Sequence, residues 1–255
     1  MIELANVSHQ FIIGKKGKER VVPVLHDIDL KVAKGEIVAI VGRSGSGKST
    51  LLNLMSGYIR PSAGEIKIGG RDVTKLSEGE WADFRLANYG FIFQSFQLIG
   101  SMTAYENVEL PLVLKGITGA ERKQRVMRLM EQIGIAEYGG HYPSELSGGQ
   151  QQRVSVARSL ILEPPIVLAD EPSGSLDSEN EKTLLTMIQQ LNHEMGITFV
   201  IITHDEQVAS IAHRAIRLQD GKLVHQSDYR QVAAHDEQHR SVAGVDYIRQ
   251  GGERE

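Results

Sequence analysis

Cysteine is missing from this sequence of 255 residues. Its absence excludes a disulfide framework, a thiolate metal site and a cysteine nucleophile. Long hydrophobic runs are missing too, because stretches such as 197–202 fall far short of the roughly 20 apolar residues that cross a bilayer. The first eight residues lack the charged start and apolar stretch of a secretory signal. We therefore expect a chain that stays inside the cell and meets a membrane only through a partner.

An excess of positive charge is also lacking. The 28 lysines and arginines are outnumbered by 32 aspartates and glutamates, which leaves a net charge of −4. This balance argues against the broad basic surface of a general nucleic-acid binder, and we expect no nucleic-acid partner. With 41% hydrophobic residues the chain can still bury a substantial core.

Short apolar or alternating segments predict strands in the first part of the chain. They cover residues 2–7, 21–32, 36–41 and 65–68, and glycine-bearing turns separate most of them. The basic run 14–20 lies between the first two. We interpret it as a solvated hairpin loop rather than as a patch that contacts phosphate or lipid.

Helical periodicity replaces this pattern from about residue 98 to residue 160, for example at Val126, Leu129, Met130 and Ile133. An apolar strand at 166–169, a helix at 178–195, a strand at 197–202 and a helix after His204 follow. This order predicts a parallel sheet covered on both faces, and thus an α/β fold. Residues 228–255 are mostly polar and predict a mobile extension outside the core.

A glycine-rich motif follows the predicted strand 36–41 directly. In such a loop, successive backbone N–H groups point at phosphate oxygens, and the next helix directs its positive dipole end to the same place. Lys48 is expected to reach the β- and γ-phosphates, and the Ser49 hydroxyl to ligate Mg²⁺. The alternative, a plain strand-to-helix turn, is disfavoured by the strand before the motif and the helix after it. The predicted ATP-binding residues are Gly42, Arg43, Ser44, Gly45, Ser46, Gly47, Lys48, Ser49 and Thr50.

Two acids and a histidine follow later strands. Asp170 and Glu171 end the strand 166–169, and His204 follows the strand 197–202, so a parallel sheet brings all three to the edge where ligands bind. We expect Asp170 to hold the Mg²⁺ shell and Glu171 to orient or deprotonate the attacking water. His204 is expected to donate a hydrogen bond to the γ-phosphate. Without the glycine-rich motif, two solvated charges and an ordinary loop histidine would be the simpler interpretation.

A second anion site begins at Leu146-Ser147-Gly148-Gly149-Gln150, which opens the helical stretch 151–160. A chain that already has one phosphate cradle needs a second nucleotide to use this site. The motif is highly specific, and with it the sequence over about residues 1–227 resembles the ATP-binding cassette (ABC) ATPases. The resemblance implies a P-loop NTPase fold with a parallel core sheet, an N-terminal antiparallel β subdomain and a helical subdomain at about 98–160.

The resemblance also implies a homodimer that sandwiches ATP and Mg²⁺ between two copies. Ser147, Gly148, Gly149 and Gln150 of one copy would close over the ATP held by Lys48 of the other. Three further roles follow from it. Ser175, Leu176 and Asp177 would line the dimer seam, Gln94 would touch Mg²⁺, and Phe11 would stack on adenine. Phe11 stands where tyrosine is more usual, and an ordinary aromatic at a strand end is the alternative for it.

Looser motifs resemble the macrolide-exporter and lipoprotein-release subfamily. This implies an integral membrane permease partner with an extracytoplasmic domain, and a peripheral position at the cytoplasmic face of the inner membrane. Export, lipoprotein release, and resistance to antimicrobial peptides or drugs are the associated functions. Ser173 and Ser175 depart from the commoner threonine and asparagine. The segments that carry this similarity are 93–98, 103–112, 143–145 and 168–177.

Several alternatives remain open from the sequence. The same ATPase would also suit a complex that transmits force or senses a drug without transport. A soluble ABC protein without a membrane subunit usually has two fused cassettes or a long coiled-coil insertion, and this sequence shows neither. A P-loop kinase or GTPase would leave the segment 146–150 unexplained. His235 and His239 have a spacing that suits metal, but a solvated pair is the simpler interpretation. The nucleotide motifs do not encode the transported substrate.

Overall fold

The computed structural model describes residues 1–15 and 17–228. Almost the whole predicted tail, with His235 and His239, therefore lies outside the described residues. Over the described ranges, no helix combines the length and the apolar character needed to cross a bilayer.

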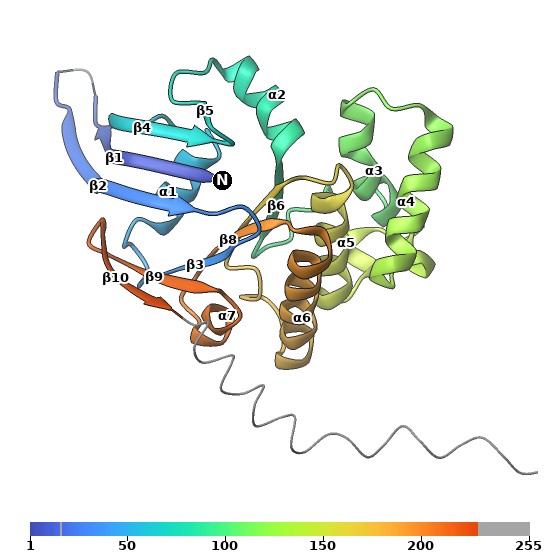
Figure 1. Ribbon diagram of the computed structural model, residues 1–255. Helices are drawn as coiled ribbons and strands as arrows, with labels where there is room; N and C mark the ends of the chain where they lie inside the picture. The colour runs from blue at the N-terminus through green and yellow to red at the C-terminus, as the bar shows by residue number, and fades with distance from the viewer. Residues whose placement is uncertain (16, 229–255) are drawn as a thin grey trace, which may run out of the picture.

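The central sheet is six-stranded over the described residues and has the order β10-β9-β3-β8-β7-β6 (Figure 1). Its neighbouring strands are parallel except for the antiparallel pair β9 and β10. The α/β fold with a parallel core is thus confirmed. The strands are β3 (Ile37–Val41), β6 (Tyr89–Phe93), β7 (Ile166–Asp170), β8 (Thr198–Thr203), β9 (Arg214–Gln219) and β10 (Lys222–Asp228).

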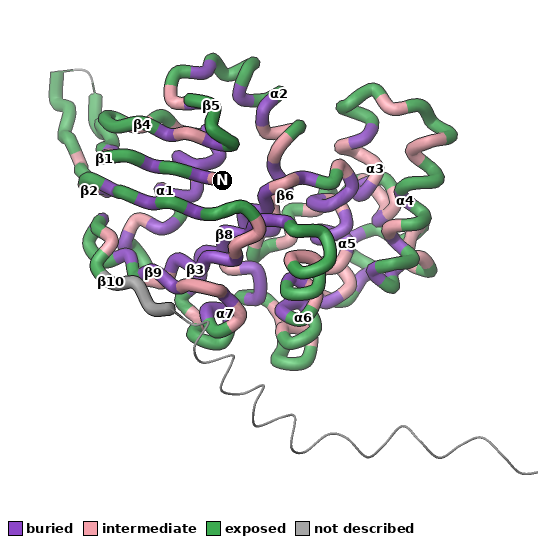
Figure 2. The backbone as a smooth tube through the Cα atoms, viewed as in Figure 1, coloured by how far each residue is buried: buried purple, intermediate pink, exposed green. Residues whose placement is uncertain are grey.

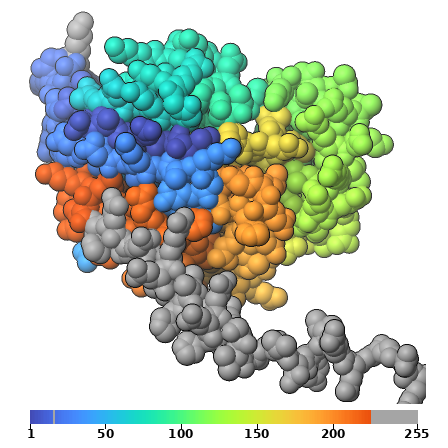
Figure 3. Space-filling view, viewed as in Figure 1, coloured from blue at the N-terminus to red at the C-terminus, as the bar shows by residue number. Residues whose placement is uncertain are grey.

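A second, antiparallel sheet has the order β2-β1-β4-β5. It comprises β1 (Ile2–Ile13), β2 (Arg20–Val32), β4 (Ala63–Ile68) and β5 (Arg71–Asp72). β1 continues well beyond Val7, where the predicted strand ended, because register shifts between Leu4 and Gln10 interrupt the alternation on which the prediction rested. Strands β1 and β2 pair as an antiparallel hairpin up to Ile13 and Arg20, so the described residues 14, 15 and 17–19 of the basic run lie in its connection, as expected. In Figure 3 this sheet lies directly against the orange strands β9 and β10, and His26 N–H donates to the Gly221 carbonyl at 2.9 Å.

Seven α-helices occur in the described ranges, and α6 (Ser178–Met195) covers the residues predicted for it. Its side-chain cap, Asp177, accepts from Asn180 N–H, and the left-handed Gly196 ends it. The prediction missed α2, β5, β6, β9 and β10. The helices are α1 (Lys48–Met55), α2 (Glu78–Asn88), α3 (Ala104–Leu114), α4 (Gly119–Ile133), α5 (Gly148–Leu160), α6 and α7 (Glu206–Ser210).

The central sheet separates two hydrophobic cores, and its buried strands are visible in Figure 2. Alternate residues of one strand enter different cores: Val38 and Ile40 lie in one, Ile37 and Ala39 in the other. The first core also contains helix α1 and the antiparallel sheet. The second contains α3 to α7. Of these, α3, α4 and α5 lie between residues 104 and 160, within the segment 98–160 that was expected to be helical. Helix α1 is therefore enclosed between the two sheets.

Asn107 fixes the loop that leads into the helical group. Its side chain is fully buried, and its Oδ1 accepts from Ile99 N–H at 2.8 Å. Its Nδ2 lies at 3.0–3.2 Å from the carbonyl oxygens of Ile99, Met102 and Thr103. One side-chain amide thus contacts backbone groups of three residues just before α3.

Replacing Asn107 with alanine should lower the free energy of unfolding by about 2–4 kcal/mol, because buried backbone groups lose their partner. Urea unfolding followed by circular dichroism measures this. Asn88→Ala is the matched control: it removes only the bond from Nδ2 to the Phe84 carbonyl and should cost about 1 kcal/mol or less. Equal costs for the two variants would contradict the role given to Asn107.

Candidate active site

The glycine-rich loop 42–47 lies between β3 and α1 at the carboxyl edge of the central sheet. Gly42 cannot be replaced without movement, because a Cβ there would lie 2.4 Å from the Leu218 carbonyl oxygen. Gly47 has φ +103°, a left-handed conformation that favours glycine, and it caps α1. The free N–H groups of the first turn of α1 therefore face the loop and form an anion site.

Lys48 is held inside this loop. Its side chain is largely buried, and Nζ donates to the carbonyl oxygens of Gly42 at 2.8 Å and Arg43 at 3.2 Å. Glu171 Oε1 lies 3.8 Å from the same nitrogen. The ammonium group thus stands between the phosphate cradle and a carboxylate from another strand.

Asp170 ends β7 and Glu171 follows it, both beside the loop, as the order of the strands predicted. Glu171 has φ +48°, which is unusual for a residue with a side chain, and its N–H donates to the Ile202 carbonyl at 2.9 Å. Burial raises the pKa of the Asp170 carboxyl above its ordinary value, and the charge of Glu171 raises it further. Hydrogen bonding to the Ser49 side chain and the charge of Lys48 act in the opposite direction.

His204 contacts Glu171 directly. Its Nδ1 lies 2.7 Å from Glu171 Oε2, and because a carboxylate oxygen accepts, Nδ1 is the donor. The sequence predicted a contact of His204 with the γ-phosphate but not this contact with the carboxylate. Glu171 therefore lies between Lys48 on one side and His204 on the other.

A hollow of about 770 Å³ collects most of the predicted nucleotide-binding residues. Phe11 and Val24 of the antiparallel sheet line it, as do Gln94, Glu171 and His204. The sequence did not point to Val24. The loop and first turn of α1 supply Arg43, Ser44, Gly45, Gly47, Lys48, Ser49 and Thr50.

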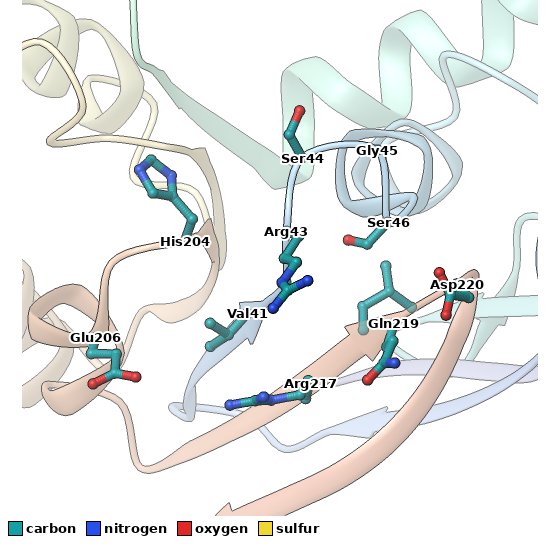
Figure 4. A pocket seen from close by; sticks show the side chains of 12 residues that line it. Val41, Arg43, Ser44, Gly45, Ser46, His204, Glu206, Arg217, Gln219 and Asp220 are labelled. Carbon is teal, nitrogen blue, oxygen red and sulfur yellow. The ribbon is translucent and has the colours of Figure 1, made fainter.

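A second hollow, of about 500 Å³, adjoins the same loop (Figure 4). Gly42 and Ser46 line it, and it shares Arg43, Ser44, Gly45 and His204 with the first hollow. Arg217 and Asp220 enter it from β9 and the turn that follows, and Glu206 from α7. The predicted cradle residues are therefore distributed over both sides of the loop.

The segment 146–150 lines neither hollow. Ser147 caps α5: its exposed side chain accepts from Gln150 N–H, while the Gln150 side chain accepts from Ser147 N–H at 2.8 Å. The helix thus presents a capped, glycine-containing N-terminus outside both hollows of its own chain.

The start of α5 packs closely against the start of α6. A Cβ on Gly149 would lie 2.1 Å from Asn180 Oδ1, and one on Gly148 would lie 3.8 Å from the Ser175 carbonyl oxygen. Asn180 Nδ2 in turn contacts the Asp177 carboxylate at 2.9 Å. The structure therefore brings together residues 147–150 and 175–177, two segments that the sequence assigned to one dimer surface.

Two further contacts of α5 escaped the sequence analysis. Arg158 donates to the carbonyl oxygens of Phe96 at 2.9 Å and Gln97 at 2.7 Å, and these two residues have φ +58° and +47°. Gln152 Nε2 donates to the Pro172 carbonyl at 2.9 Å. No local motif marks such contacts, because each joins segments that are at least 20 residues apart. Helix α5 is thereby bonded to the segment after Gln94 and to the segment after Glu171.

Comparison with known proteins identifies close relatives. The family model described as ABC transporter matches residues 25–174. The chain is 64% identical over 223 residues to the ABC transporter ATP-binding protein YtrE of Bacillus subtilis. The match covers 88% of this chain and 96% of that relative. It is 45% identical to the macrolide export ATP-binding/permease protein MacB 1/2 of Paracoccus denitrificans over 88% of this chain, but it spans only 33% of that longer protein.

Solved structures similar to this chain are also ATP-binding cassettes. A dimeric structure of a post-hydrolysis state of the ATP-binding cassette MJ0796, bound to ADP and Pi, superposes with a TM-score of 0.83 at 38% identity. The match covers 90% of this chain and 99% of that chain. The expected P-loop NTPase fold of the cassette type is thus confirmed.

Gly149→Ala should lower the midpoint of thermal unfolding of the nucleotide-free protein, because its Cβ would overlap the Asn180 side chain and displace the start of α5. We expect a cost of about 1–3 kcal/mol, measured by calorimetry. Gly148→Ala is the control, since its Cβ would have ordinary contacts. Shortening the obstructing side chain with Asn180→Ala should restore part of the loss, and an unchanged midpoint for Gly149→Ala would contradict the close packing.

Proposed function

Because the chain belongs to the ABC transporter family of ATP-binding subunits, we propose that two copies associate head to tail and hydrolyse ATP at two composite sites. In each site, Ser147, Gly148, Gly149 and Gln150 of one copy cover the ATP bound by the loop of the other. The seam between the copies contains Ser175, Leu176 and Asp177. ATP hydrolysis is the activity of the cassette; the residue roles and the arrangement of the copies are the proposal.

One observation supports the composite site above all others. The N-terminus of α5 has the chemistry of an anion site, yet 146–150 line neither hollow beside the loop of their own chain. In a twofold arrangement, the N-terminus of α5 in each copy lies against the phosphates that the other copy binds. Each copy then supplies one phosphate-binding loop and one covering segment. The solved relative MJ0796 is described as dimeric, which supports the same arrangement.

The residues around the hollow suggest how each acts in hydrolysis. Lys48 would exchange its carbonyl contacts for the β- and γ-phosphates, which leaves Glu171 free to accept a proton from the attacking water. His204 would donate to the Glu171 carboxylate through Nδ1, and a hydrogen on Nε2 as well would let the same ring donate to the γ-phosphate. Phe11 would stack on adenine at the far part of the hollow.

The donor set beside the loop fits Mg²⁺. Ser49, Asp170 and Gln94 offer hard oxygen atoms, and the Ser49 side chain is hydrogen-bonded to Asp170. The described residues contain no cluster of three or more histidine, cysteine or acidic side chains that would form an all-protein metal cage. This suits a cation that keeps waters and takes phosphate oxygens, and whose chemistry is to neutralise charge on the transferred phosphoryl group.

A membrane permease is the proposed partner. The MacB relative is named an ATP-binding/permease protein, and this chain matches 33% of its length. We infer that a separate subunit with an extracytoplasmic domain supplies the permease part. The cassette would then lie at the cytoplasmic face of the inner membrane, attached through that subunit.

Glu171→Gln should reduce ATP hydrolysis by at least about 100-fold while ATP affinity is retained, because glutamine keeps the shape of the side chain but accepts no proton. Steady-state phosphate release and equilibrium binding of a fluorescent ATP analogue measure the two quantities. Glu194→Gln, far along α6, is the control and should hydrolyse ATP at the parent rate. Parent activity in Glu171→Gln would remove the proposed role.

Ser147→Arg, made in the Glu171→Gln background, should prevent the ATP-dependent dimer because the larger cation fills the space of the covering serine. Light scattering after size exclusion, with and without ATP and Mg²⁺, gives the mass. Monomers should still bind ATP with the affinity of the parent. Thr118→Arg, at the exposed start of α4, should leave dimer formation intact; dimers of Ser147→Arg would argue against the composite site.

Purification of tagged Glu171→Gln from membranes in mild detergent with ATP and Mg²⁺ tests the partner. We expect a stoichiometric integral membrane protein with a large extracytoplasmic domain to co-purify, identified by mass spectrometry. Recovery with only soluble proteins would contradict the transporter assignment.

A further inference from the structure

His9 lies directly behind Phe11, the residue proposed to stack on adenine. The two side chains stand on the same face of β1, and their rings meet edge to face with centroids 4.6 Å apart and an interplanar angle of 84°. Phe11 is 41% exposed and lines the ATP hollow, whereas His9 is 8% exposed. The imidazole thus forms an inner support for an aromatic ring that faces the ligand.

The orientation of the His9 ring is fixed from behind. Nδ1 lies 2.9 Å from the Arg60 carbonyl oxygen, and because a carbonyl only accepts, Nδ1 carries the hydrogen. Nε2 is buried and has no hydrogen-bond partner among the described residues. Burying an unpaired nitrogen has a cost, and the edge-to-face contact with Phe11 is a favourable interaction of the same ring.

Arg60 is itself fixed to helix α1. The chain leaves α1 through a compact turn in which Tyr58 N–H and Ile59 N–H both point to the Asn53 carbonyl oxygen, at 2.9 and 3.3 Å. The Arg60 guanidinium donates to the Leu76 carbonyl at 3.1 Å. Helix α1 begins at Lys48 in the phosphate cradle and ends just before this turn. One helix therefore connects the cradle, through Arg60 and His9, to the Phe11 ring.

We infer that His9 is a positioning residue that sets the Phe11 ring for the base at a fixed separation from the phosphate cradle. This inference rests on the proposed stacking of Phe11 on adenine. A buried α1 of eight residues spans about 12 Å, so it acts as a rigid spacer between the two parts of the nucleotide site. Without His9 the Phe11 ring would keep its place on the strand but lose its orientation.

The test compares binding of ATP with binding of inorganic tripolyphosphate, which has the phosphates but no base. His9→Leu should weaken ATP binding about two- to ten-fold, the range of an aromatic pair, and leave tripolyphosphate binding unchanged. Phe11→Ala should weaken ATP binding at least as much, and Phe11→Ala with His9→Leu should show no further loss. Gln10→Ala, an exposed residue of the same strand, is the matched control. Isothermal titration gives each affinity.

The outcomes separate this inference from the proposed function. If Phe11→Ala keeps full ATP affinity, the stacking role fails and the inference fails with it. If Phe11→Ala weakens ATP binding but His9→Leu does not, only the role of His9 is overturned. An equal loss for ATP and tripolyphosphate in His9→Leu would also overturn it, because it would show a general structural effect rather than an effect on the base.

Discussion

The enclosure of helix α1 between two sheets is the constraint on which the remaining structure depends. Leu51, Leu54 and Met55 are fully buried, so the helix cannot shift without opening the first core. Its first turn carries the N–H groups of the anion site, and these have a defined position only because the rest of the helix is packed. The parallel sheet then brings the ends of β7 and β8 to the same place, which sets Glu171 and His204 beside Lys48.

Helix α5 is also largely buried, but the Ser147 side chain at its N-terminus is exposed, and two of its side chains bond to distant segments. Arg158 holds the carbonyl oxygens that follow Gln94, and Gln152 holds the one that follows Glu171. In the proposed dimer, these hydrogen bonds would link the end of α5 that covers the partner's nucleotide to both segments of its own site.

Three of the seven non-glycine residues with positive φ in the described ranges lie in these two segments. Phe96, Gln97 and Glu171 all have positive φ, each at a cost of about 1–2 kcal/mol relative to the ordinary helical region. The guanidinium of Arg158 partly holds the first two, and burial lowers the pKa of that group. The strain directs the Glu171 side chain from the strand end toward Lys48 and His204, an orientation that a regular continuation of β7 would not give.

The sequence by itself determined that the chain is an ATPase of the cassette type, because the loop 42–49, the acids after β7 and the segment 146–150 are local patterns of spacing and residue type. It also indicated the parallel core, since apolar strands alternated with helices. Only the tertiary structure decided that His204 bonds to Glu171, that Asn180 fits against Gly149, and that His9 supports Phe11. Most of these contacts join segments far apart in the chain, and a local pattern carries no information about which distant atoms meet in a packed core.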